Sequence, residues 1–236
     1  MNDLDPRYIV LIVGTALAFF LWLVVRIGTY DRRRQRGLEA LAPLIGFTYQ
    51  AKDNGLLGQL ERYRMFPPGS NPWITNVLTG WIDHAEARLL DYSWHTGTGR
   101  SSSYNVHSVV VLRSSGLALP YFAVDRAVPG LHRLVSALES RGVLPTPDGA
   151  RAGFPEDPAF SNAFVVRGDP AALRTLLDEE VRRHLMRFAG ELVGVEGHRD
   201  TMLFTRWRTV APEGVRAFLE EAAAVYRLLA ARASPR

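Results

Sequence analysis

The longest apolar stretch of the chain lies near its N-terminus. Residues Tyr8 to Val25 carry no formal charge. As a helix rising 1.5 Å per residue they would extend about 27 Å, close to the hydrocarbon thickness of a bilayer. The tail before them carries Asp3 and Asp5, unlike the positive start of a cleaved signal peptide. The pattern predicts a tail at 1–7 and a retained transmembrane helix at 8–30, against the alternatives of a cleaved signal or a buried core helix.

Basic residues cluster on the C-terminal side of this predicted helix. Arginines close to a membrane helix stay in the cytoplasm, and aromatic residues favour the interface. The sequence therefore predicts a single-pass protein of a bacterial inner membrane, with its N-terminus outside and its domain in the cytoplasm. Residues 31–45 are predicted as a basic juxtamembrane helix or linker. The residues assigned to the membrane interface and topology are Tyr8, Trp22, Arg26, Arg32, Arg33, Arg34 and Arg36.

A first α+β unit is predicted over residues 46–142. Apolar residues alternate with polar ones over 86–95 and 104–113, which indicates two strands joined by the Gly/Ser-rich loop 96–103. If the hairpin is centred on that loop, His107 lies across from Tyr92 and His95 from Tyr104. Further strands are predicted at 74–83 and 120–125, and a helix from Pro129 to Gly142.

Residues 143–158 are rich in proline and glycine and are predicted to be a linker. Beyond it, 159–236 forms a second unit: a strand at 160–167, one long helix from Pro170 to Phe188, a hairpin at 191–207 and a last helix opening at Pro212. The fold class is therefore α+β, a largely antiparallel sheet packed with helices on one face, with the two units sharing one core.

Composition narrows the possible functions. The chain has 236 residues and a net charge of +4, but residues 37–236 retain only +1. The positive charge is thus concentrated beside the predicted membrane helix, and a nucleic-acid partner has no support. The chain contains no cysteine, which excludes disulfides, thiolate zinc sites and cysteine nucleophiles.

One loop and two histidines are the candidates for ligand or partner contact. The loop could bind an anion or a partner's surface through Arg100, but it lacks the following helix that phosphate-cradling loops use, so a polar hairpin tip is the alternative. The candidate residues are Gly97, Gly99, Arg100, Ser101, His84 and His107. No complete catalytic, cofactor or metal-binding set accompanies them, and the sequence names no catalytic residue, cofactor or metal ligand.

Three segments carry a resemblance: LLDYSWHTGTGRSSSYNVHSVVVL, LALPYFAVDRA and FSNAFVVRGDPAAL. Together they resemble a loosely defined set of uncharacterised bacterial proteins, in which a membrane helix and a basic linker precede a cytoplasmic α+β domain. The resemblance covers roughly residues 30–190. It implies the location and the fold, and no activity.

The leading hypothesis is a membrane-tethered cytoplasmic domain that binds a protein partner and is not an enzyme. A tether raises the effective concentration of a domain near membrane partners. The alternative is a small-ligand sensor or enzyme with a pocket between the two units, and with loop 96–103 and His84 or His107 at its mouth.

Overall fold

The computed structural model describes residues 6–67, 69–97, 102–127 and 151–233; between residues 6 and 30 it describes side chains only at 14–17, 19, 20 and 22. The helices are α1 (Pro6–Leu44), α2 (Leu57–Leu60), α4 (Pro158–Ala163), α5 (Pro170–Leu176), α6 (Glu179–Leu185) and α7 (Val215–Ala233), with 3-10 turns at Asn54–Leu56, Met186–Phe188 and Pro212–Gly214. The strands are β1 (Thr48–Lys52), β2 (Ser70–Ile82), β3 (Ala85–Thr96), β4 (Ser103–Arg113), β5 (Leu119–Arg126), β6 (Arg151–Ala152), β7 (Phe164–Gly168), β8 (Val193–Arg199) and β9 (Thr201–Arg206).

The described strands form one antiparallel sheet in the order β1-β2-β3-β4-β9-β8-β5-β7-β6. The α+β class with a large antiparallel sheet is therefore confirmed. The strands of the two predicted units alternate in this sheet, because β5 pairs with β8 on one side and β7 on the other. The predicted hairpin register is also confirmed: Tyr92 pairs with His107, and His95 with Tyr104.

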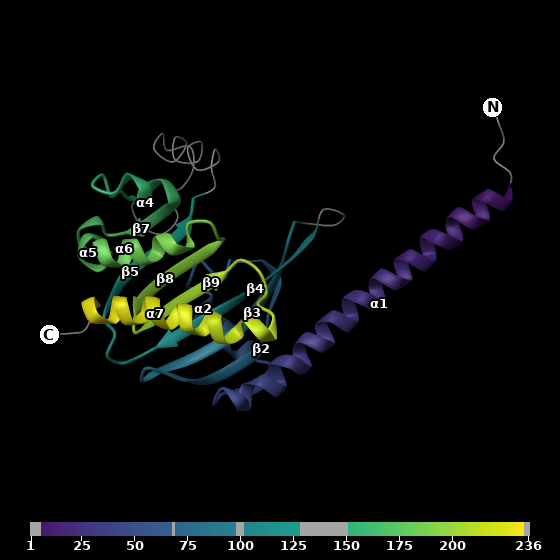
Figure 1. The fold of residues 1–236 in the computed structure, drawn as a ribbon, viewed down its shortest axis with the longest axis horizontal. Coiled ribbons are helices and arrows are strands. Elements are labelled where there is room, and N and C mark those ends of the chain that lie inside the picture. The colour runs from purple at the N-terminus through teal and green to yellow at the C-terminus, as the bar shows by residue number, and fades with distance from the viewer. Residues whose placement is uncertain (1–5, 68, 98–101, 128–150, 234–236) are drawn as a thin grey trace.

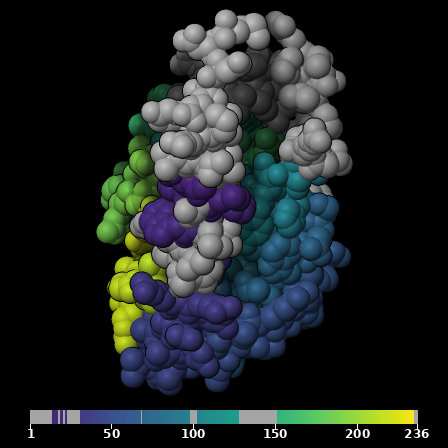
Figure 2. Space-filling view, turned by 90° about the vertical axis from the view of Figure 1, so that its right-hand side faces the viewer, coloured from purple at the N-terminus to yellow at the C-terminus, as the bar shows by residue number. Residues whose placement is uncertain are grey.

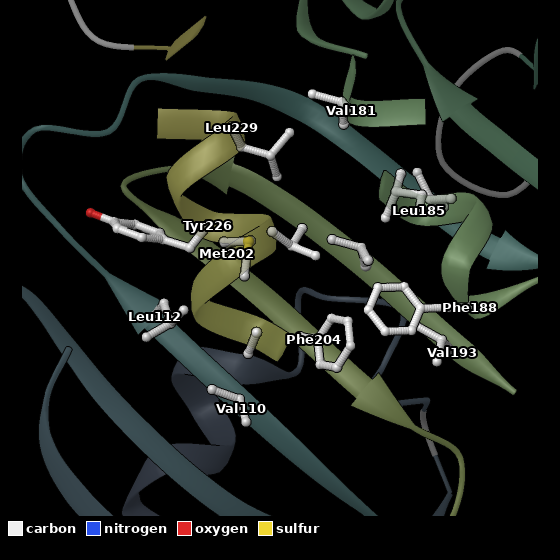
Figure 3. Packing of buried hydrophobic residues seen from close by; sticks show 14 of the residues in the cluster. Val110, Leu112, Val181, Leu185, Phe188, Val193, Met202, Phe204, Tyr226 and Leu229 are labelled. Carbon is white, nitrogen blue, oxygen red and sulfur yellow. The ribbon is translucent and has the colours of Figure 1, made fainter. Parts of the chain in front are cut away.

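Helices α1, α5, α6 and α7 cover one face of the sheet, which we call the helix face (Figure 1). Its core is almost wholly apolar. Phe204 of β9 is fully buried against Phe188 and against Phe218 of α7, with ring centroids 5.6 and 5.5 Å away. Figure 3 shows how side chains from α6, α7, β4, β8 and β9 meet there. Burial of this apolar area supplies most of the stabilisation.

A short chain segment, not a helix layer, covers part of the opposite face, which we call the loop face. Residues 53–67, including α2, place Leu56, Leu60 and Phe66 over the sheet. The sheet contributes Leu90, Tyr92, Trp94, Val109, Val111 and Leu203 to the same cluster. The prediction that helices pack on one face only is therefore incomplete, since this segment buries a second, smaller core.

Two predicted elements of the second unit differ in the structure. The strand predicted at 160–167 begins only at Phe164, because Asp157 caps α4 by accepting from the Phe160 backbone N–H. The single helix predicted from Pro170 to Phe188 is two helices. Asp178 leaves the helical conformation and caps α6 through the Val181 N–H, which ends α5 two residues earlier. The predicted helix at 129–142 lies outside the described residues.

Helix α1 continues from the apolar run into the domain and projects far beyond the sheet at its N-terminal end (Figure 1). Among the residues whose side chains are described, Leu17, Phe19, Phe20 and Trp22 are each more than half exposed. Within the part of the chain that the structure describes, no helix carries a stretch both long and apolar enough to cross a membrane.

The domain end of α1 is fixed to the helix face by a buried ion pair. Arg34, only 8% exposed, donates from both terminal nitrogens to the two carboxylate oxygens of Asp91 at 2.5 and 3.0 Å. Its Nε donates to the Val210 carbonyl at 2.9 Å, while Ser108 and Asn76 donate to the same carboxylate at 2.6 and 2.8 Å. A bidentate pair with every partner satisfied holds the helix in one rotational setting.

Candidate functional site

The candidate site is a groove where strands β5, β8 and β9 end side by side. One hollow of about 310 Å³ is lined by Arg64, Asp125, Arg126, Leu192 and Trp207. A second of about 330 Å³ is lined by Arg126, Gly190, Glu191, Leu192, Arg206, Trp207 and Arg208. Because Arg126, Leu192 and Trp207 line both, we treat the two hollows as one groove. Both volumes suit a side chain or a small ligand.

Arg126 and Arg208 give the groove positive charge that no described carboxylate pairs with. Arg206 is held by Glu221 of α7 at 2.7 Å and by Glu191 at 3.3 Å. Among the described residues, Arg126 and Arg208 make no ion pair. Trp207 is half-buried between them, and Leu192 is 52% exposed at the rim. The groove therefore offers two guanidinium groups, an indole face and an exposed apolar side chain to one ligand.

Buried carboxylates fix the inner wall of the groove. Glu196, 1% exposed, accepts the backbone N–H groups of Arg64 and Met65 at 3.0 and 3.1 Å. Burial raises the pKa of Glu196 to about 7, although these two hydrogen bonds lower it. The Arg64 side chain then reaches Asp125 at 3.2 Å, and burial also raises the pKa of Asp125. Glu196 is thus a positioning residue for Arg64.

A glycine allows the covering segment to approach the sheet. A Cβ at Gly194 of β8 would lie 3.2 Å from Met65 Cε, 3.1 Å from Thr205 Cγ2 and 3.3 Å from Asp125 Oδ1. A side chain there would require these side-chain ends to shift by a few tenths of an ångström. The close packing of Met65 on the sheet therefore uses the space that this glycine leaves.

Aromatic rings lie beneath Trp207. His107 of β4 is 1% exposed, and its ring centroid lies 4.7 Å from that of Trp207 and 5.2 Å from that of Trp94. Burial lowers the pKa of His107 to about 4, and the Met65 backbone, as a hydrogen-bond acceptor, opposes this only in part. His107 is therefore neutral at physiological pH, and its role at the groove is to support the indole.

The predicted site residues are not brought together. Gly97 has a φ of +83° at the start of the hairpin loop, while Gly99, Arg100 and Ser101 lie outside the described residues. His84 is exposed in the turn before β3, with a φ of +64°, and is not on a strand. The length of β3, about 40 Å at 3.4 Å per residue, separates His84 from the loop.

The residues predicted for the membrane interface differ in their surroundings. Trp22 is exposed on α1, and the side chains of Tyr8 and Arg26 lie outside the described ones. Arg32, Arg33 and Arg36 are exposed where α1 enters the domain. Arg34 instead points into the domain, because Asp91, Ser108 and Val210 provide it with buried acceptors.

Sequence reasoning missed the groove residues. Its one local signal is Arg206-Trp207-Arg208, which alternates cations with an aromatic residue at the end of a strand. Arg126 ends another strand, and Arg64 lies in a segment far earlier in the chain. Only the order of strands in the sheet brings them together. Among the described residues, no group of three or more His, Asp or Glu is placed to hold a metal ion.

The fold gives the class of protein. It is an α+β domain whose described strands form a nine-stranded antiparallel sheet, and the long helix α1 precedes the domain and packs on it. No protein-family model matches the chain, and no curated protein sequence matches it. Among solved structures, it is similar to the crystal structure of the mycobacterial trehalose monomycolate transport factor A, TtfA. The TM-score is 0.56 and the identity 16%, over 87% of this chain and 99% of that one. At this identity the likeness shows the fold alone.

Proposed function

We propose that the chain is a single-pass inner-membrane protein whose cytoplasmic domain binds a protein partner without catalysing a reaction. The observation that carries this is helix α1. It runs from the apolar stretch into the domain, where the Arg34–Asp91 pair fixes it. An anchor joined in this way holds the domain at a set distance from the bilayer, which is the arrangement a membrane-tethered binding module needs.

Exposed side chains on the outer part of α1 support the membrane anchor. Leu17, Phe19, Phe20 and Trp22 lie within about two turns of the helix and point in different directions, because each residue turns the helix by about 100°. A helix that is apolar on all sides is stable within a protein core or within lipid. The domain covers none of these four, which favours lipid. The N-terminus is then outside, since the exposed arginines Arg32, Arg33 and Arg36 follow the apolar stretch.

The groove is the surface we assign to the partner. Strand β9 ends at Arg206, close to Val210, whose carbonyl accepts from Arg34 of α1. The groove therefore opens at the end of the sheet from which α1 leaves the domain, within reach of another protein in the same bilayer. Arg126 and Arg208 favour an acidic segment, and Trp207 with Leu192 favours an apolar side chain next to the acidic one.

A role beside a transport process would agree with the name of the structurally similar protein, a transport factor. The proposal for this chain takes from that name nothing beyond a role beside transport.

The test is co-purification from the native membrane. The full-length protein is cross-linked in place, solubilised gently, and its partners are quantified against a chain of residues 1–45, which keeps only the anchor. A charge-reversed groove, R126E with R208E, is run in parallel. The matched control is R174E, because Arg174 is exposed on α5, away from the groove.

We expect a partner that is enriched by the full chain, lost with the groove variant and kept with R174E. Enrichment that survives charge reversal at the groove would place the partner elsewhere on the domain. No enrichment over the anchor alone would overturn the binding proposal.

A second candidate function is recognition of a small anionic ligand. The size of the groove hollow of about 310 Å³ between Arg64, Arg126 and Trp207 favours it. Thermal melting of the full chain against a panel of carboxylates and phosphates tests this directly. A ligand that binds the native state raises the melting temperature with concentration. The rise should disappear in R126E/R208E and persist in R174E, and an unchanged melting temperature across the panel would exclude this candidate.

A further inference from the structure

Three aromatic side chains cluster near the loop end of the β3–β4 hairpin. The Trp73 ring stacks on the Tyr104 ring with centroids 5.7 Å apart and planes 16° apart. His95 lies 5.4 Å from the first ring and 5.7 Å from the second. Tyr104 is 56% exposed, and its hydroxyl lies 3.2 Å from Ser93 Oγ. We call these three residues the aromatic triad.

The triad lies on the same face of the sheet as α1. Alternate residues of a strand share a face, so Asp91, Ser93 and His95 of β3 point to one side. Asp91 is the residue that Arg34 of α1 contacts. Among the described residues, the helix-face core does not include the triad, which lies beyond it toward the hairpin loop.

Helix α1 and the hairpin run in the same direction. The segment that leaves the C-terminal end of α1 places the Phe47 ring on Gly80, which pairs with Ala87 near the start of β3, while Arg34 meets Asp91 farther along the same strand. Toward its N-terminus the helix therefore follows β3 toward the hairpin loop. Figure 1 shows both projecting from the same side of the domain, and Figure 2, which looks onto that side, shows β3 and β4 beside the helix.

The triad lies level with the end of the apolar stretch of α1. From Asp91 to His95 is four residues, or about 13 Å of strand. The same length of helix is about nine residues, which leads from Arg34 to about Val25 or Arg26. Trp73 pairs opposite Ser93, and Tyr104 opposite His95, so the other two members lie at a similar height.

We infer that the aromatic triad rests in the headgroup region of the bilayer and gives the domain a second contact with the membrane beside its anchor. Trp and Tyr favour this region because their rings are apolar while their polar edges stay hydrated. Arg32 and Arg33 of α1 are exposed on the helix and can contact headgroup phosphates beside the triad. The inference rests on the proposed anchor, since it takes the height of the bilayer from it.

The absence of cysteine makes a direct test simple, because a single introduced cysteine can carry a spin label. Ser102 is exposed, lies two residues from Tyr104 on the side of the hairpin loop, and is not part of the triad. S102C therefore reports the position of the hairpin without altering the triad. L17C reports the anchor, and W81C reports the far end of β2, where Trp81 is 72% exposed. Each full-length protein is placed in vesicles of phosphatidylethanolamine and phosphatidylglycerol, and collision with oxygen and with a water-soluble nickel chelate gives the depth of each label.

We expect the L17C label in the hydrocarbon, the S102C label at headgroup depth and the W81C label in water. Adding W73A and Y104A to S102C should move that label into water, while adding W81A as a matched control should leave it in place. The L17C label should stay in the hydrocarbon in all of these proteins.

The outcomes separate the two proposals. An S102C label as accessible to the nickel chelate as W81C, with L17C still in the hydrocarbon, would overturn the second contact and leave the anchor intact. An L17C label in water would overturn the anchor and, with it, the height argument for the triad. A headgroup depth at S102C that survives W73A/Y104A would show that residues other than the triad make the contact.

Discussion

The two faces of the sheet are built differently. The helix face buries a large apolar core under α5, α6 and α7, and its buried ionic contacts include the fully satisfied Arg34–Asp91 pair. The loop face buries less, under a single short segment, and includes Glu196 and His107. Burial raises the pKa of Glu196 toward the physiological range and lowers the pKa of His107 away from it. The comparison indicates that one face supplies stability, while the other holds a site that charge and small movements can alter.

The largest expected effect comes from breaking the ion pair of the helix face. D91A leaves the Arg34 guanidinium buried without a counter-charge and removes the acceptor of Ser108 and Asn76. We expect the free energy of unfolding to fall by about 5 kcal/mol, measured by denaturant unfolding of the full chain in detergent. The matched control is R34M/D91L, which removes both charges and should recover most of the loss. A loss below about 1 kcal/mol in D91A would mean that the pair does not hold α1.

Truncation of one large side chain on each face compares their packing. F204A opens a cavity among Phe188 and Phe218 and should cost about 4 kcal/mol. L60A, in the covering segment of the loop face, should cost about 2 kcal/mol, because that segment can settle into the space left. Equal costs in the same unfolding assay would contradict the division between the faces.

The loop face should make stability depend on pH in two opposite ways. Glu196 has a raised pKa in the folded state, so its contribution is greatest below pH 4.5 and is lost as pH rises through about 7. His107 has a lowered pKa, so its contribution is present above pH 6.5 and is lost as pH falls toward about 4. Asp125 and Arg64 act on the Glu196 carboxylate, Arg64 and Arg167 act on Asp125, and the raised pKa of Asp125 changes stability in the same direction as that of Glu196.

Two substitutions separate these contributions. In H107F, stability should fall by about 2–3 kcal/mol between pH 5 and pH 8. In E196Q, the fall due to Glu196 should disappear, and stability should instead rise between pH 4 and pH 6.5, because the contribution of His107 remains. Unfolding curves across this range give both slopes. Variants that keep the wild-type profile would show that neither group controls it.

The smallest expected effect on stability comes from the groove itself. R126A and R208A remove side chains that make no ion pair among the described residues, so each should change the free energy of unfolding by less than about 0.5 kcal/mol. The double variant R126A/R208A should lose the partner in the co-purification assay, as R126E/R208E should. A large loss of stability would instead show that these arginines support the fold, and their assignment to binding would fail.

Much of the sheet could be predicted from the sequence, because alternation and loop length determine a hairpin locally. The pairs Tyr92–His107 and His95–Tyr104 follow from the centre of loop 96–103 alone. The break between α5 and α6 could not be predicted from helical periodicity, which continues through it. The cap formed by Asp178 at the Val181 N–H competes with that periodicity and prevails.

The groove and the role of Arg34 depend on contacts between distant parts of the chain. Arg34 belongs to a basic run typical of a membrane boundary, and nothing near it in sequence indicates Asp91, which lies 57 residues away. Arg64 and Arg126 likewise line one groove only because β8, whose Glu196 holds the Arg64 backbone, pairs with β5, which ends at Arg126. Sequence patterns describe single elements well, but they do not determine which element ends lie side by side.

The Arg34–Asp91 pair has a geometrical consequence for any partner in the bilayer. Because α1 is one helix, its rotation about its own axis is transmitted to the domain, and each residue of helix corresponds to about 100° of turn and 1.5 Å of height. One residue inserted between Arg26 and Arg34 would therefore point the groove toward a different neighbour while leaving every contact inside the domain unchanged. The length of the helix thus determines the orientation of the domain about the membrane normal, and with it the side from which a partner can bind.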